Sequence, residues 1–216
     1  ADASDVIGIN SKDRFLGVGG ALELARGLQY NNNARFAKRI TLADASITDE
    51  GSNLDGLREM AKAFKECHHL IQLDFSGNLI GSTGLRYLLS GIQPSLHANL
   101  QSLDLSRNGL HSTGCSVLGE FFQPVYTHYI ERNLEHTAVH SEAAPSEKSS
   151  PAHSLPHVAQ KLESLYLDGN NITDFGNSEE GTVALTEGLH HLPALRHLRL
   201  SHNRLTPRAV RALSEF

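Results

Sequence analysis

The eleven-residue stretch LIQLDFSGNLI, residues 70–80, recurs three more times in this chain of 216 residues. The later copies are LQSLDLSRNGL (100–110), LESLYLDGNNI (162–172) and LRHLRLSHNRL (195–205). Each copy keeps apolar residues at its first, fourth, sixth and eleventh positions and an asparagine at its ninth. The central apolar–x–apolar triplet has the two-residue period that places both apolar side chains on one face of a short strand. The phrase therefore predicts a repeated strand with one buried face.

The asparagine at the ninth position of each copy has a physical role. Where the chain leaves a strand, its backbone N–H and C=O groups lose their partners in the sheet. A side-chain amide both donates and accepts hydrogen bonds, so it satisfies either kind of group. We therefore expect a buried amide at Asn78, Asn108, Asn170 and Asn203.

A helical pattern follows each phrase. In GSTGLRYLLSGI (81–92) and HSTGCSVLGEFF (111–122), apolar or small residues recur at spacings of three and four, which gives one apolar stripe on a helix. Each unit thus reads as strand, turn, helix and return. One such unit cannot bury its inner face alone, whereas stacked units share a continuous core.

Together these motifs resemble the leucine-rich repeat, and the strand–helix unit is similar to that of the ribonuclease-inhibitor-like subclass. The subclass also includes the Ran GTPase-activating protein, NOD-like receptors and tropomodulin-type actin-capping proteins. The resemblance implies an α/β solenoid, or horseshoe, with parallel strands on the concave face and helices on the convex face. Two units near the start are weaker: Ile9 lies in one expected strand, and Ala45 stands where the other unit should have asparagine.

The spacing of the units predicts a single domain over residues 1–216. Its six units are 4–36, 37–69, 70–99, 100–122, 162–194 and 195–216. The segment 123–160 breaks the period and holds four of the seven prolines. Residues 141–156 consist mainly of Ser, Pro, Ala and Glu with little to bury, so we expect a largely disordered inserted loop.

The composition excludes several classes of protein. A net charge of −5 does not favour a nucleic-acid partner, and no apolar run has the length of a membrane span. Two cysteines form no disulfide framework, which favours a reducing compartment. We expect a cytoplasmic protein, with a cytoskeletal or ciliary assembly as one setting.

No motif indicates a catalytic, cofactor or metal site. The pairs His136/His140 and His153/His157 have metal-ligand spacing, but they lie in the insert, where solvated histidines are the commoner interpretation. GVGG (17–20) lacks the rest of a phosphate-binding loop and predicts a turn into a helix. The doublets at 68–69 and 190–191 are expected to cap helix C-termini, and Cys115 is expected in the core.

The residues that differ between copies of the repeated phrase indicate a recognition surface. If the leucines of each strand point inward, the residues between and beside them face the concave side. The residues that we expect to bind a partner there are Asp74, Asp104, Tyr166, Asp168, His197 and Arg199. They form an acidic patch that ends in an aromatic residue and a basic edge, which suggests a protein partner with a basic segment. An enzyme that uses Asp74 and Asp104 as a carboxylate pair is disfavoured, because an open, wet face does not tune pKa values.

We therefore expect a non-enzymatic protein-interaction or scaffolding module that is part of a larger protein or assembly. The alternative is a GTPase-activating protein of the Ran-activator type, which the resemblance implies without mapping any functional residue. Phe216 ends the chain inside the helix of the sixth unit. A terminal repeat normally carries a polar outer face, so we expect further repeats or a partner to cover this end.

Overall fold

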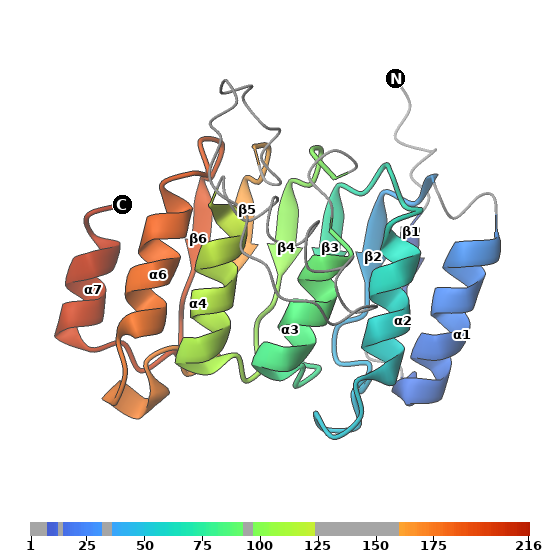
Figure 1. Ribbon diagram of the computed structural model, residues 1–216, viewed down its shortest axis with the longest axis horizontal. Helices are drawn as coiled ribbons and strands as arrows, with labels where there is room; N and C mark the ends of the chain where they lie inside the picture. Colours follow the sequence, from blue (N-terminus) through green and yellow to red (C-terminus); the bar gives the residue numbers. More distant parts are fainter. Residues whose placement is uncertain (1–7, 13–14, 32–35, 93–96, 124–159) are drawn as a thin grey trace, which may run out of the picture.

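The computed structural model describes residues 8–12, 15–31, 36–92, 97–123 and 160–216. In this part of the chain, six short strands alternate with six α-helices (Figure 1). The strands are β1 (Gly8–Asn10), β2 (Arg39–Thr41), β3 (Gln72–Asp74), β4 (Ser102–Asp104), β5 (Ser164–Tyr166) and β6 (His197–Arg199). The helices are α1 (Gly17–Tyr30), α2 (Asp55–Phe64), α3 (Gly81–Ser90), α4 (His111–Phe122), α6 (Glu180–Leu189) and α7 (Pro207–Leu213), with a 3-10 turn, η4 (Asp174–Gly176), before α6.

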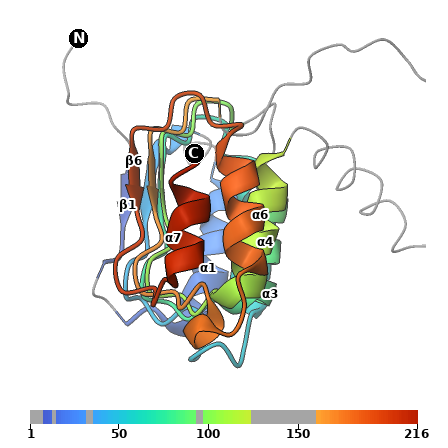
Figure 2. The ribbon, with the colours of Figure 1, turned by 90° about the vertical axis from the view of Figure 1, so that its left-hand side faces the viewer.

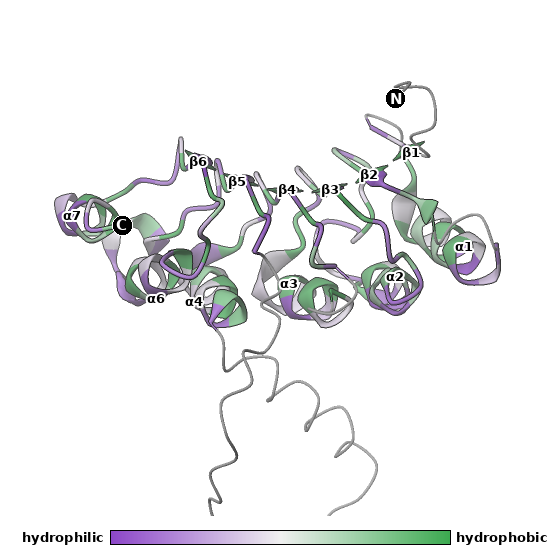
Figure 3. Cartoon of the chain, turned by 90° about the horizontal axis from the view of Figure 1, so that it is seen from above, coloured by the Kyte–Doolittle hydropathy of each residue, from purple (hydrophilic) through white to green (hydrophobic). Residues whose placement is uncertain are grey.

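The strands form one parallel sheet in the order of the sequence, β1 to β6. Equivalent residues of the repeated phrase face each other, so that Leu73 pairs with Ile40 on one side and with Leu103 on the other. Seen along the stack, the strands lie on one side and the helices on the other (Figure 2). Seen from above, the sheet bows toward the helices, so its outer face is concave (Figure 3). The predicted solenoid with strands inside and helices outside is confirmed.

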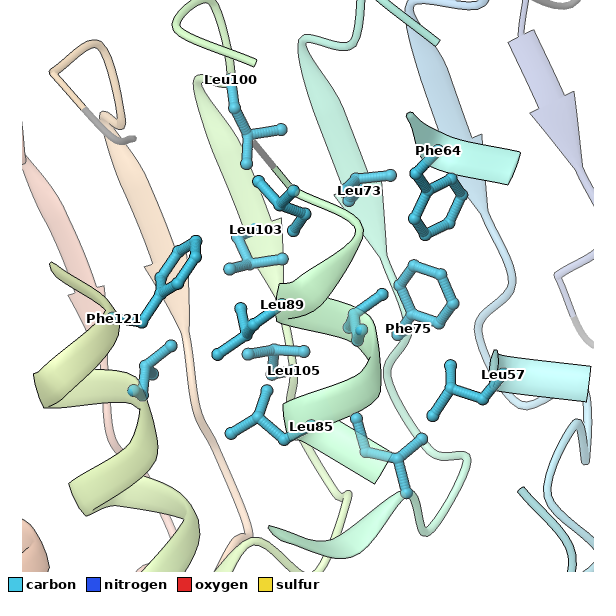
Figure 4. Packing of buried hydrophobic residues seen from close by; sticks show 14 of the residues in the cluster. Leu57, Phe64, Leu73, Phe75, Leu85, Leu89, Leu100, Leu103, Leu105 and Phe121 are labelled. Carbon is cyan, nitrogen blue, oxygen red and sulfur yellow. The ribbon is translucent and has the colours of Figure 1, made fainter. Parts of the chain in front are cut away.

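The core lies between the sheet and the helices. The two inward leucines of β4 and its continuation, Leu103 and Leu105, are buried, as are Leu85 and Leu89 of α3 (Figure 4). The residues that pack there recur in every central unit, which makes the core one continuous row rather than six separate clusters. Because each unit buries its neighbours' inner faces, no unit is stable on its own.

The asparagines form the predicted ladder of buried amides. The Asn78 Oδ1 atom accepts from the backbone N–H of Ala45 (3.2 Å), and its Nδ2 donates to the carbonyls of Leu42 (2.8 Å) and Phe75 (2.9 Å). In the same way, the Asn108 Oδ1 atom accepts a 3.0 Å hydrogen bond from the backbone N–H of Asn78 in the preceding unit. Each amide therefore closes the turn of the preceding unit as well as its own.

Ala45 explains how the ladder ends without an asparagine. Its backbone carbonyl accepts from the N–H groups of Leu16 (3.0 Å) and Gly17 (3.1 Å) at the start of α1. A main-chain oxygen thus replaces the side-chain oxygen that serves the later units. The weak first unit still stacks on the second, because β1 pairs with β2 in the same register.

The fifth unit stacks directly on the fourth. β5 pairs with β4, and α6 packs so closely on α4 that a Cβ atom added to Gly119 would lie 2.1 Å from the Ala184 carbonyl oxygen. The neighbouring Gly188 approaches the Gly119 carbonyl oxygen in the same way, at 2.4 Å. The predicted inserted loop lies, for residues 124–159, outside the described residues, and so do His136, His140, His153 and His157.

Three smaller expectations are confirmed. Gly17 has a φ of +64° and begins α1, so GVGG forms a turn into a helix. Ring nitrogens of His68 and His190 lie 3.1 Å and 2.8 Å from carbonyl oxygens of the last turns before them. Cys115 is buried in the core. No helix of the described residues is both long and apolar enough to span a membrane.

Candidate protein-binding face

The sheet register brings the expected binding residues onto one surface. Asp74, Asp104, Tyr166 and Arg199 occupy equivalent positions on β3, β4, β5 and β6, so they form one row across the sheet. His197 lies two residues before Arg199, and Asp168 two residues after Tyr166. Because side chains alternate along a strand, this row points away from the buried leucines and onto the concave side. We call these six residues, with Ser76 and Ser106, the concave face.

Serines of the following turns hold the two central carboxylates in place. Asp74 Oδ1 accepts from the backbone N–H (3.0 Å) and the hydroxyl (2.8 Å) of Ser76. Asp104 Oδ1 accepts from the backbone N–H of Ser106 at 2.9 Å. Both carboxylates are half-buried, and in the described part of the chain neither forms an ion pair with a basic side chain. The sequence Asp-x-Ser thus fixes two carboxylates on neighbouring strands, with no basic side chain of the described residues in direct contact with either.

The surroundings of Asp104 disfavour its charge. Burial raises the pKa of the Asp104 carboxyl, hydrogen bonds from Ser106 oppose this effect, and the carboxylates of Asp74 and Asp168 raise the pKa further. Burial removes solvating water from the ionised form, and like charges repel it. A cation placed between these carboxylates would relieve both effects.

The expected basic edge is only partly available. Arg199 Nη2 lies 2.8 Å from Asp168 Oδ2, and its guanidinium stacks on the Tyr166 ring at 5.6 Å. Asp168 Oδ1 also accepts from the backbone N–H of Ser201 at 2.7 Å. The third acidic residue and the basic residue of the sequence pattern therefore neutralise each other, because neighbouring strands bring them within reach. His197 lies exposed beside them.

A second ion pair on this surface was not predicted from the sequence. Arg107 Nη2 reaches across one unit to Asp44 Oδ2 at 2.8 Å, and this hydrogen bond raises the pKa of Arg107. The pair passes over Gly77, where an added Cβ atom would lie 2.0 Å from Asp44 Oδ1. Asp44, Gly77 and Arg107 occupy the same position in three consecutive units. Opposite charges on either side of a glycine at one repeat position were the signal that could have revealed the pair.

The paired arginines border a hollow of about 500 Å³ on this surface. Its walls include the carboxylates of Asp104 and Asp168 and the side chains of Arg107 and Arg199, with serines and Gly169 between them. Among the described residues, no cluster of His, Cys, Asp or Glu could hold a metal ion. The arrangement offers charge and hydrogen-bond complementarity to a protruding side chain.

Comparison with known proteins matches the repeats to the same segments. The Leucine Rich repeat family model matches residues 66–89, 97–119, 158–176 and 191–214. The chain is 28% identical over 159 residues to "NACHT, LRR and PYD domains-containing protein 3" of Rattus norvegicus, which covers 73% of this chain and 14% of the relative. It is 26% identical over 191 residues to "Protein NLRC5" of Mus musculus, which covers 82% of this chain and 10% of the relative.

This chain thus spans 14% or less of the length of these curated relatives. The name of the first relative describes a protein that contains an LRR domain. The four matched segments coincide with the repeated phrases, with their strands β3 to β6 and with the amide ladder. These four units of the chain are leucine-rich repeats.

Proposed function

We propose that the concave face binds a protein partner that inserts a basic side chain between Asp74 and Asp104. The chain acts as a non-enzymatic protein-interaction module within a larger protein or assembly. The observation that carries the proposal is the pair of half-buried carboxylates on adjacent strands, which form no ion pair in the described part of the chain.

The spacing of the pair suits a cation. Adjacent strands lie about 4.8 Å apart, so one lysine ammonium or arginine guanidinium reaches both carboxylates at once. Asp74 and Asp104 use Oδ1 for the serine hydrogen bonds, which fixes their orientation before a partner arrives. Tyr166 lies next to Asp104 in the row and adds an aromatic surface of the kind enriched at binding hot spots.

The arginines of the face limit competition from within the chain. Arg107 is held by Asp44 and Arg199 by Asp168, each at 2.8 Å. Both side chains are therefore held at the rim by another carboxylate, although the charges of Asp74 and Asp104 also act on Arg107. Their exposed positions also leave them able to contact an acidic group of the partner beyond its basic segment.

The open end of the solenoid supports a second feature of the proposal. Leu198 of β6 and Leu200, which follows this strand, are only partly buried, whereas their counterparts Leu165 and Leu167 are fully buried. We propose that further repeats or a partner cover this end. Self-association of residues 1–216 in solution is the expected sign, and a strictly monomeric, soluble product at high concentration would contradict it.

The cellular setting and the alternative activity stay predictions. Cys67 and Cys115 are buried free thiols, which supports a reducing, cytoplasmic location, while the cytoskeletal and ciliary settings stay without further support. The GTPase-activating alternative rests on the family resemblance, and an assay of stimulated GTP hydrolysis tests it.

A double substitution tests the concave face. A phage-displayed library of random peptides is selected against the wild-type chain, and we expect enriched peptides that contain Lys or Arg. Their affinity should fall by about tenfold or more for Asp74→Asn with Asp104→Asn, since an unpaired charge in the partner remains desolvated. Asparagine keeps an oxygen that can accept the serine hydrogen bonds, so the fold is preserved.

The matched control removes two charges elsewhere. Asp49→Asn with Glu50→Gln changes two exposed acidic residues of the turn before α2, away from the sheet. We expect this variant to bind the same peptides as the wild type. Equal loss in both variants would mean that net charge, rather than the concave face, attracts the peptides, and no loss in the first variant would refute the proposed site.

A further inference from the structure

Two turns of this chain have the same unusual conformation. Residues 49–51 have φ values of +47°, +54° and +87°, and residues 174–176 have φ values of +48°, +59° and +88°. A threonine precedes each run, and its backbone carbonyl accepts from the N–H five residues on, at 3.0 Å in both turns. Each threonine hydroxyl also donates to a carbonyl of the next unit, Thr48 to Asn78 and Thr173 to Arg204. The second and fifth units thus use one turn design.

The two turns differ at their middle position, which is Glu50 in one and Phe175 in the other. A left-handed backbone is uncommon for any residue other than glycine and is unfavourable for a bulky one. Glu50 shows that an exposed charged residue meets the needs of this turn. Phe175 nevertheless leaves 61% of its surface in water. The conformation of the turn therefore does not explain why the fifth unit has an aromatic residue at this position.

The ring of Phe175 belongs to a larger feature. The Arg204 guanidinium lies 4.4 Å from the ring centroid, so a phenylalanine and an arginine, two residue types enriched at protein interfaces, are stacked at the surface. Gly176, the next residue, lines a hollow of about 630 Å³ between η4, α6 and α7. Val183 of α6 also lines the hollow and is 44% exposed, so the hollow has an exposed apolar side chain on its wall.

The charges around this hollow are mainly acidic. Glu179 is held by Arg208 at 3.0 Å and accepts from the Thr206 hydroxyl at 2.6 Å. Glu180 and Glu187 line the same hollow, and within the described residues neither forms an ion pair. Beside the exposed Val183, the hollow therefore has two carboxylates without an ion pair to any described residue, and its wall at Gly176 directly follows Phe175 in the sequence.

We propose that Phe175, Arg204 and the hollow bounded by Glu180, Val183 and Glu187 form a second docking surface for a protein segment with apolar and basic side chains. An apolar side chain of the partner packs on Phe175 and Val183, and a lysine or arginine lies near Glu180 and Glu187. The charge of the hollow favours such a partner over a second copy of this chain, whose net charge is −5. This surface comes from η4, α6 and α7, so it is separate from the carboxylates of the concave face.

The key variant is Phe175→Glu, because the chain itself shows that the turn accepts glutamate in this conformation. Random peptides displayed on phage are selected against the wild-type chain, and the affinities of enriched peptides are measured by fluorescence anisotropy. We expect one class of peptides with Lys or Arg beside an apolar residue to lose affinity by about tenfold or more in Phe175→Glu, as for a hot-spot aromatic. The same peptides should lose affinity in Glu180→Lys with Glu187→Lys.

Two controls show whether the affinity depends on this surface in particular. Glu50→Phe places the same ring in the equivalent turn without the acidic hollow, and it should gain no affinity for these peptides. Asp74→Asn with Asp104→Asn should leave their affinity unchanged, so that failure here and failure of the concave face are distinguishable. Thermal unfolding of Phe175→Glu is expected to match the wild type, and Phe175→Asn supplies a second variant if it does not.

Two results would overturn the proposal. The first is a set of enriched peptides that all bind Phe175→Glu and Phe175→Asn as tightly as the wild type. The second is a wild-type dimer in sedimentation analysis that Phe175→Glu converts to a monomer, because a second copy would then occupy the surface.

Discussion

Asn108→Ala tests whether the amide ladder holds the units together. Asn108 is fully buried, and its Oδ1 accepts from the N–H groups of Asn78 (3.0 Å) and Ile80 (3.4 Å). Its Nδ2 donates to the carbonyls of Phe75 (3.0 Å) and Ser106 (3.2 Å). The substitution removes all four contacts at once, in the centre of the solenoid.

The hydrogen-bond partners show which groups would be left without a bond. The Phe75 carbonyl keeps a bond from Asn78 Nδ2 (2.9 Å), and the Ser106 carbonyl keeps one from the Gly77 N–H (2.8 Å). The N–H groups of Asn78 and Ile80 have no other acceptor in the described part of the chain. An unsatisfied buried group costs about 1–3 kcal/mol, so the two together should lower the free energy of unfolding by roughly 2–6 kcal/mol.

Urea denaturation followed by circular dichroism measures this loss. A decrease of that size is a large share of the roughly 5–15 kcal/mol that stabilises a typical domain. The control is Asn99→Ala, an exposed asparagine that accepts from Lys161 at 2.7 Å and should change the free energy by less than about 0.5 kcal/mol. A loss below about 1 kcal/mol for Asn108→Ala, with an unchanged dependence on urea, would refute the structural role of the ladder.

Three further predictions concern the charge, the helix packing and the insert. Burial raises the pKa of Asp104, so above that pKa the ionised carboxylate destabilises the folded chain. Asp104→Asn should therefore raise the melting temperature at pH 7, and the gain should shrink as the pH falls below the pKa of Asp104. A gain that grows in acid would contradict this prediction. Gly119→Ala should destabilise the chain by about 1–3 kcal/mol, because its Cβ atom would meet the Ala184 carbonyl at 2.1 Å, whereas Gly27→Ala, with nothing within 4 Å, should be neutral or stabilising in thermal melts. Deleting residues 141–156 should leave the melting temperature within a few degrees, since α4 and α6 pack directly without them; an insoluble product would show that they are packed.

The sequence determined the parts of this protein that repeat. Strand, turn and helix are set by local periods of two and of three to four residues. Because the units are alike, they stack with equivalent strand residues paired. The row of Asp74, Asp104, Tyr166 and Arg199 followed from counting along the phrases, and the sheet has that row. The role of Asn78 followed as well, because a polar residue inside an apolar frame must satisfy buried backbone groups.

Only the tertiary structure decided which charges meet. Arg199 counted as a free basic edge in the sequence, yet it pairs with Asp168 of the neighbouring unit, and Arg107 crosses a whole unit to reach Asp44. Both pairs depend on the reach of a long side chain between units, and the Arg107 pair also needs the room left at Gly77. The exposure of Phe175 likewise depends on three consecutive left-handed residues in its turn. Repeated local forces fix the frame of this protein, whereas contacts between units decide the chemistry of its surfaces.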